Sequence, residues 1–209
     1  MMKDLSPRTT VRGCAVAAAI VLGVALGCGP ATAGIDGTNS VVDHSKRTVQ
    51  AISENTRISF VPPLDGSPFT REWFHDGRAA YHVSGPSASD WHGHITIGYM
   101  VGYPASIDGK LKFTYDTPGL ELELTTPPAL DFFDLLPRAG IEVDVGIGPG
   151  IKTVEAAGGD VSGTDGFIQM SGFHCTVTGV LGTTTIRPFV QVVSSDGDTV
   201  VAYGPISTI

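Results

Sequence analysis

The fold of this chain is decided by one stretch, residues 94–116, which reads HITIGYMVGYPASIDGKLKFTYD. Its large apolar residues fall on odd positions, and its even positions are mostly polar, small or charged. The odd set comprises Ile95, Ile97, Tyr99, Val101, Tyr103, Ile107, Leu111, Phe113 and Tyr115. Because successive side chains of a strand point to opposite faces, this alternation predicts β-structure with one apolar and one polar face.

The alternation returns after a loop, in residues 138–149, RAGIEVDVGIGP. One face of this return arm carries Ile141, Val143, Val145 and Ile147, and the other carries Glu142 and Asp144. Pro104 divides the first stretch because a proline cannot donate a ladder hydrogen bond. Two arms of twelve residues each result, 105–116 and 138–149. A tilted membrane-spanning strand needs about 9–11 residues, so both arms are long enough to cross a bilayer.

One hairpin cannot cross a bilayer alone, because each unpaired backbone group at its edges costs several kcal/mol in lipid. The residues by themselves leave two interpretations open. Several chains each contribute a hairpin to one closed barrel, or the hairpin packs on a second sheet in an ordinary soluble β-sandwich.

The first 33 residues have the pattern of an export signal. Lys3, Arg8 and Arg12 precede an apolar run from Cys14 to Gly27, and Ala31-Thr32-Ala33 is a small-x-small cleavage site. We therefore expect a cleavable signal peptide, with cleavage after Ala33. A lipoprotein leader acylated at Cys28 is the alternative, although the leucine that usually stands three residues ahead of the cysteine is absent.

The composition of the mature chain favours a single all-β domain. After Ala33 the chain has 10 basic and 20 acidic residues, a net charge of −10, which suits cationic solutes and argues against nucleic acid as a partner. Cys175 is then the one remaining cysteine, so no intramolecular disulfide is expected. The 27 glycines and 14 prolines of the chain suit short strands and turns. A short helical turn around residues 67–80 stays open as an alternative, because Pro68, Thr70 and Glu72 resemble a helix start.

The flanks of the hairpin read as the two halves of one β-domain. Strands are expected at 47–52, 56–61 and 79–84 before it, and at 167–180, 183–194 and 199–204 after it. The expected organisation is therefore a first half at 34–92, a hairpin segment at 93–149 with a tip loop at 117–137, and a second half at 150–209.

Several short motifs, in this order, resemble the MspA family of mycobacterial-type outer-membrane porins. They are REWFH (71–75), GYMVGYP (98–104), FTYDTP (113–118), GPGI (148–151), DVSG (160–163), TVTG (176–179) and RPF (187–189). The resemblance runs from Gly34 to Gly204. It implies a goblet-shaped homo-octamer in the outer membrane, with a β-sandwich rim and a sixteen-stranded barrel stem to which each subunit gives two strands.

The resemblance also implies that the narrowest point of the pore lies in the tip loop and is lined by acidic side chains. The matching stretch here is PGLELEL (118–124), which makes Glu121 and Glu123 the candidate constriction residues. A ring of such carboxylates attracts cations. The best-known members carry adjacent aspartates where this chain has Glu123 and Leu124, so which glutamate faces the lumen stays open.

The alternation of the two arms assigns the remaining candidate residues to two faces. Lumen-lining residues are expected on the polar face, at Asp108, Lys110, Lys112, Asp116, Glu142 and Asp144. Lipid-facing residues are expected on the apolar face, at Ile107, Leu111, Phe113, Tyr115, Ile141, Val143, Val145 and Ile147. Cross-strand ion pairs on a soluble sheet would give the same polar pattern.

Two other classes of protein remain open. Trp73 and Trp91 could serve as stacking platforms in a secreted carbohydrate-binding module. Asp90, His92 and His94 share one face of a strand and would suit a zinc enzyme, although no second His or Cys cluster completes the site. No nucleophile elbow or phosphate loop is present. We therefore expect no enzyme and no cofactor, but a homo-oligomeric porin in contact with outer-membrane lipids that passes small hydrophilic solutes, cations preferentially.

Overall fold

The structure, a computed structural model, describes residues 34–115 and 141–209. These residues belong to one compact unit, Ala33–Ile209. Its elements are β1 (Ile35–Val42), β2 (Thr48–Val61), β3 (Thr70–Ser84), η1 (Ala88–Asp90), β4 (His92–Tyr103), β5 (Ala105–Ser106), β6 (Lys110–Tyr115), β7 (Ile141–Asp144), β8 (Gly150–Ser162), β9 (Asp165–Thr178), β10 (Val180–Leu181), β11 (Thr185–Ser194), β12 (Thr199–Tyr203) and β13 (Ser207–Thr208). Across the described ranges, no helix has both the length and the apolar character that a membrane crossing requires.

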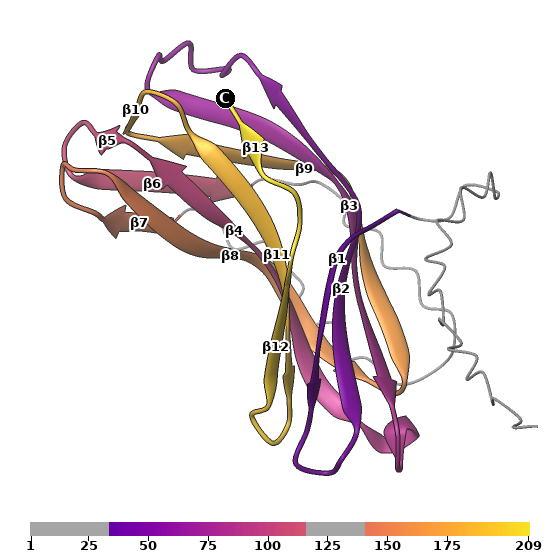
Figure 1. Ribbon diagram of the computed structural model, residues 1–209. Helices are drawn as coiled ribbons and strands as arrows, with labels where there is room; N and C mark the ends of the chain where they lie inside the picture. The colour runs from indigo at the N-terminus through magenta and orange to yellow at the C-terminus, as the bar shows by residue number, and fades with distance from the viewer. Residues whose placement is uncertain (1–33, 116–140) are drawn as a thin grey trace, which may run out of the picture. The chain divides into compact units, whose positions relative to one another are not determined.

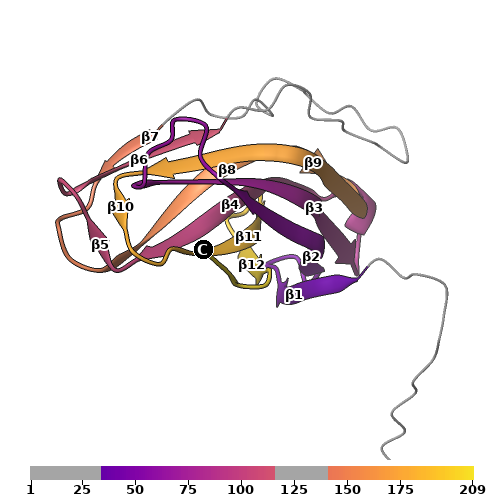
Figure 2. The ribbon, with the colours of Figure 1, turned by 90° about the horizontal axis from the view of Figure 1, so that it is seen from above.

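Two large antiparallel sheets and one two-stranded sheet make up the unit (Figure 1). The first has six strands in the order β1-β2-β3-β9-β6-β7. The second has the order β12-β11-β4-β8, and β13 pairs with β11 beyond the end of β12. Strands β5 and β10 form a separate pair, and the view from above shows how strongly the longer strands curve (Figure 2). The all-β fold expected from the sequence is confirmed.

Both sheets contribute to one core. The odd face of β4 supplies Ile95, Ile97, Tyr99 and Val101, none more than 1% exposed. The Tyr99 ring meets Trp73 of β3 edge-on, with ring centroids 5.7 Å apart, and Tyr81 of β3 lies 5.3 Å from Trp91. The first pair is edge-to-face, a favourable arrangement that joins β3 of the first sheet to β4 of the second. The second pair is tilted and packs β3 against the connection that precedes β4.

Strand β4 lies inside the sandwich, although the sequence assigned residues from 93 onward to the hairpin. It pairs with β11 on one side and with β8 on the other over nearly its whole length. The sandwich therefore covers the apolar face of residues 93–103, and the chain leaves the second sheet only at Pro104. A residue without an N–H cannot continue the ladder, which explains why the strand stops there.

The alternative of a helical turn around residues 67–80 is wrong, since residues 70–84 form the long strand β3. From residue 73 to residue 83 every odd position is buried, including Trp73, His75, Ala79 and Tyr81. A histidine and a glycine at positions 75 and 77 interrupt the run of large apolar side chains, and the period-two pattern is correspondingly hard to see in the sequence.

Two residues show how closely the second sheet is packed. A Cβ at Gly98 of β4 would overlap the ring of Phe189 on β11, so that only glycine fits where these strands meet. Pro188 lies in the middle of β11, where a proline is unusual. On the side of β11 that faces β12 and β13, residues 189–193 pair with β12 and residues 185–186 pair with β13. Pro188 lies between these two paired segments, so its missing N–H removes no ladder hydrogen bond on that side.

Candidate functional site

The candidate pore segment begins with a tight turn between β5 and β6. Ser106 Oγ donates to the carbonyl of Gly146 at 2.7 Å and accepts a bond from the Gly109 N–H at 3.1 Å. Gly109 has φ +74°, a left-handed conformation that favours glycine. Its carbonyl accepts from the Val145 N–H at 2.7 Å, which joins the start of β6 to the end of β7.

The polar face of the hairpin points outward in the single chain. Strand β6 pairs with β7 in a register that sets Lys110 opposite Asp144 and Lys112 opposite Glu142. Lys110 Nζ also donates diagonally to Glu142 Oε1 at 2.9 Å. The described residues expected to line a lumen are all exposed, namely Asp108, Lys110, Lys112, Glu142 and Asp144. Mixed charges with water on this face are compatible with an aqueous lumen and with a soluble sheet alike.

The apolar face does not point outward along its whole length, as the lipid-facing assignment would require. Leu111 and Phe113 are fully buried and belong to the core of the sandwich. Val143 and Val145 are partly buried against that core, whereas Ile107 and Ile147 are 44% and 71% exposed. The odd and even faces are those expected, but the single chain covers much of the odd face with its own residues.

Pairing between β6 and β9 is the cause of this burial. Residues 112–115 pair with residues 178–175, so that β6 extends the edge of the first sheet. Phe113 lies opposite Val177, and the side chain of Leu111 packs near Gly179. In a single chain in water, burial of two large apolar side chains is favourable by roughly 1.5–3 kcal/mol each.

Several expected site residues lie outside the described part of the chain. They include the constriction residues Glu121 and Glu123, the lumen residue Asp116 and the whole tip loop 117–137, as well as the leader with Cys28 and Ala33. Tyr115 and Ile141 end β6 and begin β7, and only their backbone positions are described.

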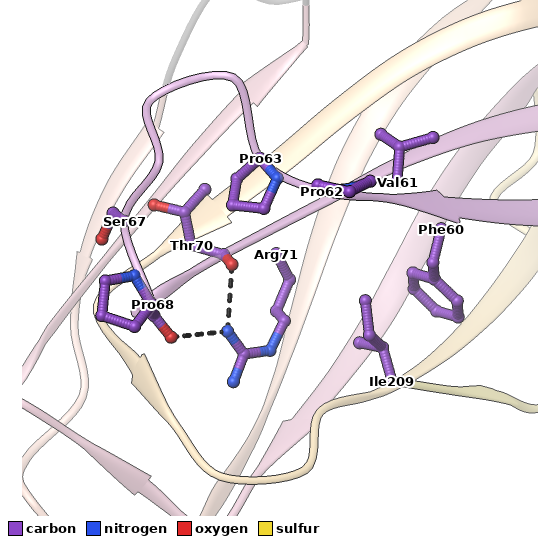
Figure 3. A pocket seen from close by; sticks show the side chains of 9 residues that line it. All are labelled: Phe60, Val61, Pro62, Pro63, Ser67, Pro68, Thr70, Arg71 and Ile209. Atoms are coloured by element: carbon purple, nitrogen blue, oxygen red, sulfur yellow. Dashed lines mark hydrogen bonds between the residues drawn. The ribbon is translucent and has the colours of Figure 1, made fainter.

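A groove of about 500 Å³ lies near the hairpin end of the sandwich (Figure 3). Its lining is mostly apolar and includes Phe60, Pro62 and Ile209. Arg71 Nη1 donates to the carbonyls of Pro68 and Thr70 at 2.8 and 3.0 Å, and Nη2 donates to that of Gly182 at 2.9 Å. The guanidinium thus holds residues 68–70 against the turn after β10. Nothing in this lining pairs a nucleophile with a base.

The metal-enzyme hypothesis gains no support from the described residues. His94 Nδ1 lies 2.7 Å from Asp160 Oδ1, so this histidine already has a carboxylate partner. Asp90 and His92 are exposed. Within 34–115 and 141–209, no group of three or more His, Cys, Asp or Glu side chains is arranged to hold a metal ion.

The tryptophans of the carbohydrate-binding hypothesis are not surface platforms. Trp73 and Trp91 are both 0% exposed and pack in the core. A sugar ring can stack only on an aromatic face that solvent can reach. Neither residue can therefore play the role that this alternative gave it.

Sequence reasoning missed the extent to which histidines are built into this fold. His75 is 2% exposed, its Nδ1 is hydrogen-bonded to Tyr99 OH at 2.8 Å, and burial lowers its pKa to about 4. His174 Nε2 lies 2.9 Å from Oε1 of the buried Glu72, whose Oε2 accepts from the Leu64 N–H at 2.8 Å. The signal for His75 was its odd position in β3, in phase with Trp73 and Tyr81.

Comparisons with known proteins agree on one family. The family model MspA matches residues 43–207. Among curated proteins of Mycolicibacterium smegmatis, porin MspC is 38% identical over 210 residues, which cover 97% of each chain. Porin MspD is 42% identical over 182 residues, or 84% of this chain and 87% of its own, and porin MspA is 39% identical over 183 residues with the same coverage.

Proposed function

This chain belongs to the MspA family of porins, and we propose that several copies of it form a water-filled channel through the outer membrane. Small hydrophilic solutes diffuse through it passively, cations in preference to anions. The porin names of its relatives indicate a channel protein of the cell envelope rather than an enzyme. Removal of a signal peptide after Ala33 would release the mature chain.

The observation that carries this proposal is the two-faced hairpin. Its even positions 108, 110, 112, 142 and 144 are charged and exposed, and its odd positions 107, 111, 113, 143, 145 and 147 carry apolar side chains. Barrels in membranes alternate in this way, with apolar side chains toward lipid and polar side chains toward the lumen. The arms expected from the sequence, 105–116 and 138–149, have the length of about 9–11 residues or more that a tilted spanning strand needs. In the single chain, the strands described within them are shorter, β6 at 110–115 and β7 at 141–144, and a turn separates β5 from β6.

Assembly then requires β6 to exchange one pairing partner for another. In the single chain β6 lies between β7 and β9, whereas in a barrel it would lie between its own β7 and the β7 of a neighbouring copy. The number of backbone hydrogen bonds is conserved, and lipid replaces the sandwich around Leu111 and Phe113. Closure of the ring leaves no unpaired edge in the membrane. We propose eight copies, by analogy with the family.

The proposed cation preference rests on acidic residues at the narrowest point. Glu121 and Glu123 lie two residues apart, so in extended chain both would point the same way. Fixed charges act strongly within about one Debye length, ~10 Å at 0.1 M salt, so they matter most where the pore is narrowest.

Planar-bilayer recording of the purified mature protein tests the function directly. In a KCl gradient we expect channels whose reversal potential has the sign of a cation-preferring pore. The double variant Glu121→Gln, Glu123→Gln should lose most of this preference and admit anions more readily, whereas Asp144→Asn should change it much less.

Three results would count against the proposal. If the purified protein forms no channels, the proposed channel function is wrong. If wild-type channels prefer anions, the proposed cation preference is wrong. Channels of the double variant with an unchanged reversal potential would show that the selectivity lies elsewhere in the pore.

A further inference from the structure

The end of the sandwich opposite the hairpin is formed by four connections, which we call the distal end. They comprise residues 43–47, 85–91, 163–164 and 195–198, at the lower end of the ribbon in Figure 1. Backbone bonds join them: the Ser195 N–H donates to the His92 carbonyl, and the Gly163 N–H donates to that of Trp91. Strand β4 runs from His92 at this end to Tyr103 at the hairpin end. At about 3.3 Å per residue, its twelve residues separate the two ends by roughly 36 Å.

Four of the six histidines of the chain lie at or beside the distal end, together with aspartates from every neighbouring strand. The histidines are His44, His82, His92 and His94, the aspartates are Asp43, Asp90, Asp160, Asp165, Asp196 and Asp198, and the fixed cations are Lys46 and Arg47. Six carboxylates and two cations give a net charge of −4 while the histidines are neutral. Protonation of all four histidines brings this charge to zero.

Three of these histidines face a carboxylate across two different connections or strands. His44 of the β1–β2 turn lies 2.7 Å from Asp198 of the β11–β12 turn. His94 of β4 lies 2.7 Å from Asp160 of β8, and His82 of β3 contacts Asp165 of β9. His92 is exposed and has no ion pair among the described residues. Each pair carries one negative charge when its histidine is neutral and none when it is protonated.

The other charged groups that face these histidines are aspartates, one lysine and one arginine. Arg47 is buried and bonds to Asp43 at 2.7 Å, with Asp196 3.8 Å away. Lys46 and Asp90 are exposed. Unperturbed aspartate, lysine and arginine do not change charge between pH 5 and 8, whereas histidine does. Among the described residues of this end, the four histidines are therefore the groups that set its charge in mild acid.

We propose that the distal end is a proton-responsive mouth of the channel, where His44, His82, His92 and His94 switch the local charge from negative to neutral as the pH falls. This inference rests on the proposed function, because a hairpin inserted in the membrane leaves the distal end in water at the entrance. A negative mouth concentrates cations, and a neutral mouth does not. The channel therefore loses part of its cation preference in acid, before any permeating ion reaches the constriction.

The electrostatics of His44 have the sign that the switch requires. Its hydrogen bond and charge interaction with Asp198 raise the pKa of His44 above the usual value. A raised pKa means that the ion pair is fully formed in acid and is lost as the pH rises through that pKa. Acid therefore neutralises this mouth charge and ties the β1–β2 turn to the β11–β12 turn at the same time.

The test measures reversal potentials of single channels at pH 7.5 and pH 5.5, in a KCl gradient centred on 0.1 M. The test variant carries His44→Gln, His82→Gln, His92→Gln and His94→Gln, and the control carries His174→Gln, at a histidine outside the distal end. In wild type and control we expect the cation-to-anion permeability ratio to fall about twofold or more on acidification, a response that 1 M salt suppresses by screening. In the fourfold variant the ratio should stay near its value at pH 7.5.

Every outcome of this test is informative. A fourfold variant that responds to pH as the wild type does would overturn the inference while leaving the channel function intact, because the response would then belong to the constriction glutamates. Wild-type protein that forms no channels would instead overturn the proposed function. If the fourfold variant does not assemble, the double variant His44→Gln, His92→Gln, at two exposed positions, should retain about half of the wild-type response. A full response in that double variant would also overturn the inference.

Discussion

At the scale of single residues, His75 is the most deeply buried of the described histidines. It occupies an odd position of β3 beside Trp73, where its Nδ1 is bonded to Tyr99 OH. Its Nε2 has no hydrogen-bond partner among the described residues. Burial lowers its pKa to about 4, because the charged imidazolium would lose its hydration there. At neutral pH the residue therefore connects the two sheets as a neutral group.

This lowered pKa predicts acid sensitivity with a defined sign. Below about pH 6.5 the unfolded chain takes up a proton that the folded chain refuses until about pH 4, so stability falls as the pH falls across this window. At pH 5 the loss attributable to His75 should be about 2 kcal/mol of unfolding free energy. Urea unfolding of the monomeric chain, followed by the fluorescence of the two buried tryptophans at pH 7.5 and 5.0, measures it.

The variant His75→Gln isolates this contribution because glutamine can keep a hydrogen bond without titrating. Its stability should change less with pH than that of the wild type, and the exposed control His92→Gln should behave like the wild type. Equal pH dependence in all three proteins would mean that His75 does not govern the response.

At the scale of elements, alternation defines which residues share a face but not what covers that face. Strands β4 and β6 carry the same odd apolar pattern, and in the single chain the sandwich covers both. The sequence therefore predicted the all-β fold correctly, and within β6 and β7 the described odd positions are the more buried ones. It also assigned residues 93–103 to the hairpin, because their partners in β8 and β11 lie 47 to 101 residues further along the chain and leave no local trace. The burial of Leu111 and Phe113 likewise depends on residues that are distant in the sequence, those of β9.

The proposed exchange of β6 from β9 to a neighbouring copy can be blocked with a disulfide. Lys112 and Thr178 are register partners across β6 and β9, and directly opposed Cβ atoms lie close enough for a bridge in narrow pairs. Lys112→Cys with Thr178→Cys should stay monomeric and form no channels when oxidised, and should recover channel formation when reduced. Burial raises the pKa of the Cys175 thiol, which keeps this native cysteine from competing.

The single variant Lys112→Cys is the control, and its channels should not depend on reducing agent. Gel filtration and bilayer recording of the oxidised double variant give the decisive comparison. Normal channels from a fully oxidised double variant would show that β6 and β9 stay paired in the pore, and that no exchange takes place.

At the scale of the whole described unit, the two ends of the sandwich differ in chemistry. Eight of its eleven exposed large apolar residues lie toward the hairpin end: Leu64, Phe69, Ile107, Ile147, Ile151, Leu181, Ile206 and Ile209. The distal end carries the four paired or exposed histidines and their aspartates instead. Apolar surface of this kind marks a membrane or protein contact. The asymmetry supports an orientation with the hairpin end toward lipid and the distal end toward water.

The central claim, that the even face of the hairpin lines the pore and the odd face meets lipid, is tested most directly at two adjacent residues. Val143→Cys and Asp144→Cys are made separately, and single channels are recorded while a charged, membrane-impermeant thiol reagent is added. We predict that the conductance of Asp144→Cys channels drops as the reagent reacts in the lumen, whereas Val143→Cys channels do not respond because their thiol faces hydrocarbon. Block at Val143→Cys without block at Asp144→Cys, or equal block at both positions, would contradict the assignment.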